Sequence, residues 1–103
     1  MERQSEKKHF EWDENKNRNN IKKHGISFSE ACSVFYDENA VLFDDPDHSD
    51  DEERFILMGI SENEKLCLVC HCYRESDNVI RIISARKATK KESIEYLEIQ
   101  RGW

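Results

Sequence analysis

The chain has 103 residues, enough for one domain with a single modest core. Apolar and charged residues each make up 37%, and this polar composition favours one sheet with helices laid on it. No apolar run approaches 18 residues, which argues against a membrane-spanning helix. The charged residues 1–8 do not resemble a secretory signal either. We therefore expect a cytoplasmic protein with no membrane partner.

The net charge of −6 is unevenly distributed along the chain. Residues 1–24 carry seven Lys/Arg against five Asp/Glu, and residues 66–103 carry the same numbers, so each end has a charge of +2. Residues 25–65 carry two against twelve, a charge of −10. Because the field at a site depends on local charge, the two ends can still form a basic surface.

The N-terminal part predicts a flexible segment, a short strand and a polar helix. Residues 1–9 are charged and expected to be flexible, so the folded domain spans residues 10–103. Residues 10–12 alternate like an edge strand. Asp13 is a good cap for a helix over residues 14–24, and Gly25 is a good stop. Ile21 is the only strongly apolar residue of this helix, so it is either a solvated surface helix or one that faces a polyanion.

A second helix is predicted to face the core. Ser27 and Glu30 have the spacing of a capping box. Its apolar residues recur at helical spacing, at Phe28, Ala31, Val34 and Phe35. The helix should end near Tyr36 or Asp37.

A strand at residues 40–43 is followed by an acidic loop at residues 44–53. Pro46 and the surrounding aspartates mark the loop. Its carboxylates suggest calcium, but the glycine that an EF-hand loop needs is missing. A solvated acidic loop is favoured over a metal site.

The C-terminal half predicts three strands and a helix. The strands span residues 54–60, 66–73 and 79–85, and short polar connections favour antiparallel hairpins between them. Thr89 and Glu92 form a second capping box for a helix from Lys90 to about Arg101. Ile94, Leu97 and Tyr96 are its candidate packing residues. The predicted fold class is α+β: a small antiparallel sheet with two N-terminal helices and one C-terminal helix.

The cysteines favour packing over metal or haem chemistry. Cys67, Cys70 and His71 match the string for haem attachment and half of a zinc site. They lie, however, in an apolar run that indicates a buried strand, where cysteine is a small apolar side chain. No metal and no cofactor are expected.

Basic residues at strand and helix ends are the candidates for chemistry. Arg86 ends a strand just before a helix, a good position for binding an anion. Arg81 should face a different environment, because its odd spacing from Arg86 places the two on opposite faces of a regular strand. Arg74 should lie roughly a strand length from Arg86. A lone His71 in a strand is more often structural than catalytic. Arginine suits a phosphate site because its planar fork binds phosphate through two hydrogen bonds and stays charged.

Three groups of residues in this chain resemble BrnT-type toxins. The first is Phe10-x-Trp12-Asp13-x-x-Lys16 with Asn20-x-x-Lys23-His24-Gly25-Ile26-Ser27-Phe28-x-Glu30-Ala31. The second is Asp45-Pro46-x-His48-Ser49-x-x-Glu52-x-Arg54-Phe55. The third is His71-x-x-Arg74 with Arg81-Ile82-Ile83-Ser84-Ala85-Arg86-x-Ala88-x-x-x-Glu92. Together they cover residues 10 to about 97.

This resemblance implies the ribonuclease half of a type II toxin–antitoxin pair, with a RelE-like fold. It implies metal-free RNA cleavage, in which the ribose 2′-OH attacks the adjacent phosphate, and growth arrest as the outcome. It also implies a hetero-oligomer with a BrnA-like ribbon-helix-helix antitoxin, through which the pair contacts operator DNA and represses its own operon. The implied catalytic residues are Arg74, Arg86, His24 and His71. The implied RNA-binding residues are Lys16, Lys23, Arg81, Lys87 and Lys90.

Two other functions are compatible with the residues. A non-catalytic binding module would use the acidic residues 25–65 to dock a basic or DNA-binding partner. Metal-dependent hydrolysis would use the acidic loop. Both stay open at the level of sequence.

Overall fold

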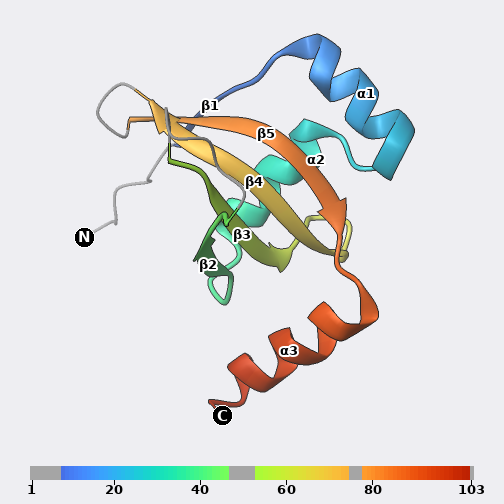
Figure 1. Cartoon of the computed structure of the whole chain (residues 1–103), viewed down its shortest axis with the longest axis vertical. Coiled ribbons are helices and arrows are strands. Elements are labelled where there is room, and N and C mark those ends of the chain that lie inside the picture. The colour runs from blue at the N-terminus through green and yellow to red at the C-terminus, as the bar shows by residue number, and fades with distance from the viewer. Residues whose placement is uncertain (1–7, 47–52, 75–77, 103) are drawn as a thin grey trace, which may run out of the picture.

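The computed structural model describes residues 8–46, 53–74 and 78–102, and within them the chain forms an α+β fold (Figure 1). The elements in chain order are β1 (His9–Glu11), α1 (Glu14–His24), α2 (Phe28–Ser33), the 3₁₀ helix η1 (Val34–Tyr36), β2 (Val41–Asp44), β3 (Phe55–Ile60), β4 (Leu66–Arg74), β5 (Val79–Lys87) and α3 (Lys90–Gln100). β1 begins at His9, within the segment 1–9 that was predicted to be flexible, and residues 1–7 of that segment lie outside the described residues.

The sheet is mixed, so the prediction of an antiparallel sheet is correct for four strands and wrong for the fifth. Its order is β1-β5-β4-β3-β2, and β2 to β5 pair antiparallel as a meander. β1 pairs parallel with β5, with His9 opposite Val79. Short hairpins impose antiparallel pairing on sequence neighbours, whereas β1 and β5 are separated by most of the chain and no tight turn fixes their relative direction.

The predicted N-cap residues are confirmed in all three α-helices, and one of the two predicted capping boxes is complete. Asp13 accepts hydrogen bonds from two backbone N–H groups of α1, and Gly25 ends the helix with a φ of 72°. Thr89 and Glu92 form a complete capping box. Ser27 caps α2, but the Glu30 carboxylate turns away and accepts a 2.7 Å hydrogen bond from the Ser61 hydroxyl, so only half of that box forms.

The core lies between α2 with η1 and one face of the sheet, which we call the core face. Phe28, Ala31 and Val34 are fully buried, as their spacing predicts. They belong to one cluster with sheet residues that include Val69 and Ile82. Figure 1 shows α2 passing behind β4 and β5. The opposite face, which we call the open face, is therefore available to carry a site.

Helix α1 is attached by an asparagine and not by its apolar residue. Asn20 is buried, whereas Ile21 is 43% exposed. The Asn20 amide donates 2.8 Å hydrogen bonds to the carbonyls of Ile26 and Ala85, and its oxygen accepts one of 3.1 Å from Ala85 N–H. Asn20 thus pairs with β5 much as a neighbouring strand would, beyond the point where β1 ends. The polar sequence of α1 is partly structural.

A β-bulge in β5 reverses the expected facing of its arginines. The partners of Cys70 and His71 are Ser84 and Ile82, so Ile83 is an extra residue. Arg81 pairs with Cys72 and Arg86 with Leu68, an even separation along β4 that places both arginines on one face. The prediction of opposite faces is wrong, because it assumed a regular strand.

Helix α3 packs through a single buried residue. Tyr96 is 7% exposed, whereas Ile94 and Leu97 are more than half exposed, so the expectation that those two pack is wrong. Figure 1 shows α3 extending away from the strand end that precedes it. No α-helix in the described part of the chain is long and apolar enough to span a membrane.

Candidate active site

The open face contains a cavity of about 310 Å³. Its floor is formed by side chains of β3, β4 and β5 that alternate with the core-facing residues. The residues around it are His24, Asp45, Arg54, Ile56, Leu68, Cys70, Ile83, Ser84 and Arg86. The bulge brings Ile83 and Ser84 to the cavity side by side, which a regular strand would not do.

Three basic or titratable side chains meet at this cavity from three separate elements. His24 is the last residue of α1, whose end is fixed by Gly25 and by the Asn20 hydrogen bonds. Arg54 directly precedes β3, and Arg86 comes from β5. This combination provides cationic groups for an anion and an imidazole, the side chain that most often serves as a general acid or base. The cavity thus brings together two of the residues that the sequence analysis expects to be catalytic, His24 and Arg86.

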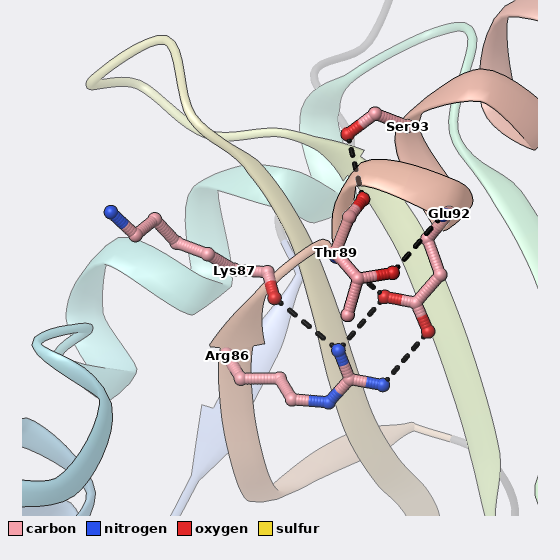
Figure 2. Close-up of polar contacts among 5 residues, drawn as sticks. All are labelled: Arg86, Lys87, Thr89, Glu92 and Ser93. Carbon is pink, nitrogen blue, oxygen red and sulfur yellow. Dashed lines mark hydrogen bonds and ion pairs between the residues drawn. The ribbon is translucent and has the colours of Figure 1, made fainter.

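Arg86 is held by an ion pair with Glu92 in the first turn of α3 (Figure 2). Two hydrogen bonds of 2.9 and 3.0 Å join the guanidinium to the carboxylate. The hydrogen bond from Arg86 lowers the pKa of Glu92 to about 2, and the same bond raises the pKa of Arg86. Both groups are consequently ionised throughout the physiological range.

Asp45 and Cys70 form a hydrogen-bonded pair on the cavity wall. The Cys70 thiol donates a 3.4 Å hydrogen bond to Asp45 Oδ2. Burial, followed by the contact with this carboxylate, raises the pKa of Cys70 to about 12. Since the thiolate is the reactive form of cysteine, Cys70 is not a nucleophile at neutral pH.

Arg74 and Arg81 form a second cluster, away from the cavity. Both contact the same oxygen of Glu11, at 3.5 and 2.9 Å. Arg74 lies six positions along β4 from Leu68, the partner of Arg86, which corresponds to roughly 20 Å. The sequence prediction of a separation of about a strand length is confirmed. Arg74 and Arg86 do not form one compact site.

His71, which was expected to be catalytic, lies on the core face and does not border the cavity. It is fully buried, with its ring next to the rings of Phe35, Phe55 and Tyr73. Burial lowers the pKa of the imidazole. Its Nδ1 lies 3.1 Å from the carbonyl oxygen of Val69. These contacts fit a structural role for His71, which is the more common role of a lone histidine in a strand.

The lysines predicted to bind RNA are exposed and do not border the cavity. Lys16 and Lys23 lie on α1, and Lys90 begins α3. Lys87 pairs with the buried Cys67, so its side chain leaves the strand on the core side, opposite to Arg86. Their role stays a prediction.

Arg54 is the cavity residue that the sequence analysis missed as a candidate. A usable signal was present, because Arg54 belongs to the second group of family-like residues and stands at a strand start.

The described residues offer no group of three or more His, Cys, Asp or Glu side chains suited to a metal ion. Most of the predicted acidic loop, residues 47–52, lies outside the described part of the chain. Cys67 and Cys70 leave β4 on opposite faces, which prevents joint coordination of one ion, and Cys67 is a fully buried core residue. The core-strand interpretation of this cysteine is confirmed.

Comparisons with known proteins agree with this fold and show the family. A search of curated proteins finds no match. A solved structure, the ribonuclease toxin BrnT of Brucella abortus, superposes with a TM-score of 0.62 and 24% identity, over 82% of this chain and 100% of that chain. At that identity the likeness establishes the fold. The family model described as "Ribonuclease toxin, BrnT, of type II toxin-antitoxin system" matches residues 12–92. The chain therefore belongs to the BrnT family of type II ribonuclease toxins.

Proposed function

We propose that this toxin cleaves RNA without a metal ion, at the cavity on the open face. The observation that carries the proposal is the convergence of His24, Arg54 and Arg86 around one cavity of about 310 Å³. Family membership supports ribonuclease activity in general. The identity of these three side chains supports a mechanism that relies on fixed cations and proton transfer.

In this mechanism the ribose 2′-OH attacks the adjacent phosphorus and the bond from phosphorus to the 5′-oxygen breaks. The products are a 2′,3′-cyclic phosphate and a 5′-OH end. Arg54 and Arg86 stabilise the negative charge that develops on the phosphoryl oxygens. His24 is the histidine at the cavity, and histidine is the most common general acid or base, so we assign it to proton transfer with the 2′-OH or the leaving oxygen.

The second arginine cluster supports an RNA path along the open face. The bulge places Arg81 on the same face as Arg86, and Arg74 lies beside Arg81. Two guanidinium groups share one carboxylate there, so the cluster keeps a net positive charge. We assign Arg74 and Arg81 to phosphates that flank the cleaved one. Arg74 is thus a binding residue and not a catalytic one.

The test is cleavage of a defined RNA in EDTA by wild type and three alanine variants. Removing one fixed donor for transition-state charge typically slows a reaction about 10²–10³-fold, and we expect losses of that order for Arg86→Ala and Arg54→Ala. Arg101→Ala is the matched control, because Arg101 is exposed at the far end of α3. Cleavage that strictly requires a divalent ion, or Arg86→Ala and Arg54→Ala variants as active as the control, would refute the proposal.

The family description implies an antitoxin, and we propose one of the BrnA-like ribbon-helix-helix type. It would neutralise the toxin in a cytoplasmic hetero-oligomer and contact operator DNA for both proteins. Expression of the chain alone should arrest bacterial growth, and co-expression of the neighbouring gene should relieve the arrest. Unchanged growth together with intact cellular RNA would instead favour the non-catalytic binding module.

A further inference from the structure

Glu92 joins the start of α3 to the proposed active site. Its Oε1 accepts hydrogen bonds from Arg86 Nη1 and from the backbone N–H of Thr89, at 2.9 and 2.8 Å. Its Oε2 accepts one from Arg86 Nη2 at 3.0 Å. Arg86 Nη1 also donates to the carbonyl of Lys87 at 3.3 Å. One carboxylate therefore caps a helix and holds a guanidinium.

The contact leaves a defined edge of Arg86 available. A guanidinium has five N–H donors in a rigid fork. Three of them are used, two toward Glu92 and one toward Lys87. The remaining two are Nε–H and the second N–H of Nη2, which have no partner among the described residues and project from the same side of the fork. Figure 2 shows this side turned away from Glu92.

We propose that Glu92 is a positioning residue that fixes the Arg86 fork so that its Nε/Nη2 edge binds the cleaved phosphate. The inference rests on the proposed ribonuclease function. The Nε–H and Nη2–H donors are parallel, so they can bind two phosphate oxygens in the same way that Nη1 and Nη2 bind the two oxygens of Glu92. Because Glu92 lies in the first turn of α3, the orientation of Arg86 depends on that helix being docked.

The alternative role of Glu92 is that of a competitor. A carboxylate neutralises part of the arginine charge, and substrate phosphate would then have to displace it. The two roles predict opposite effects of the same substitution. Removing the carboxylate lowers activity if Glu92 positions Arg86, and raises it if Glu92 competes with RNA.

Glu92→Gln separates the two roles in the full-length toxin. Gln can still accept the Thr89 N–H hydrogen bond, since capping boxes use Glu or Gln, but it cannot accept two bonds from the guanidinium. Loss of a partner that orients an active-site group typically costs 10–100-fold. We expect kcat for RNA cleavage to fall by about that factor, with KM changed by less than about threefold, because the interaction with Arg86 matters most in the transition state.

Two further variants distinguish positioning from folding. Thr89→Ala removes the other half of the capping box and keeps the Glu92 carboxylate, so it should lower thermal stability and leave kcat within about twofold of wild type. In an Arg86→Ala background, Glu92→Gln should have no further effect on kcat, since the two residues act as a unit.

If the Glu92→Gln toxin were as active as wild type, or more active, the positioning role would be refuted while the ribonuclease function would stand. An equal loss from Glu92→Gln with and without Arg86 would overturn it as well. A wild-type toxin that leaves RNA intact in the same assay would refute the proposed function, and this role with it.

Discussion

The attachment of α1 through Asn20 leads to a quantitative stability prediction. Asn20→Ala removes three hydrogen bonds of 2.8, 2.8 and 3.1 Å and leaves the backbone groups of Ala85 without those partners. Each bond contributes about 1 kcal/mol net, and an unsatisfied buried group costs about 1–3 kcal/mol. Alanine regains roughly half a kcal/mol in helix propensity. The free energy of unfolding should therefore fall by about 2–4 kcal/mol.

Asn19→Ala is the matched control, because Asn19 is the exposed neighbour of the same type in the same helix. Urea and thermal unfolding, followed by circular dichroism, should show Tm falling by roughly 10–20 °C for Asn20→Ala. Asn19→Ala should stay within about 0.5 kcal/mol of wild type. If the two variants were equally stable, Asn20 would not be the attachment of α1 to β5, and the account of this polar helix would be wrong.

Three further outcomes follow from buried groups. Lowering the pH from 7.5 to 5.5 should destabilise the fold through His71, because its lowered pKa keeps it neutral while the unfolded chain gains a proton below about pH 6.5. His71→Phe should reduce that pH dependence in urea unfolding, and an unchanged slope would contradict the assignment. Gly59→Ala should lower the free energy of unfolding by about 1–3 kcal/mol, because the added Cβ would lie 2.9 Å from Ala40 Cβ and from Asp37 Oδ2. A variant that unfolds like wild type in urea would refute this close packing. Cys70, with its pKa near 12, should resist iodoacetamide at pH 8 in the folded protein, and rapid alkylation seen by mass spectrometry would show the thiol to be ionised.

Local signals predicted the elements well. The caps at Asp13, Ser27 and Thr89 act within a single helical turn, so their effect can be read directly from neighbouring residues. The strands followed from apolar runs bounded by polar turns. These features need no knowledge of which segments meet in space.

The parts that sequence reasoning missed depend on contacts between distant segments. The parallel pairing of β1 with β5 and the role of Asn20 at Ala85 join residues about 65 to 70 positions apart. No local pattern in α1 distinguishes Asn20 from its exposed neighbour Asn19. Burial of one asparagine among several is decided by the partner surface.

The candidate site shows the same division. Resemblance to a family supplied His24, Arg86, Arg74 and His71 as one set, and geometry separated that set into three places. His24 and Arg86 border the cavity, Arg74 lies with Arg81, and His71 is in the core. The missing member, Arg54, was visible as a motif residue. Only the fold showed that it shares a cavity with the other two.

The extra residue in β5 also bears on how this toxin is compared with its relatives and redesigned. Two arginines five positions apart share a face only because Ile83 lies outside the pairing. A chain with one residue fewer at this point, and a regular strand, would present both arginines in the same directions. The number of residues between them can therefore vary by one without moving either side chain, provided that the bulge is gained or lost with it. Alignments and insertions in β5 should preserve the pairing of Arg81 with Cys72 and of Arg86 with Leu68, because this pairing determines which side chains the open face presents to RNA.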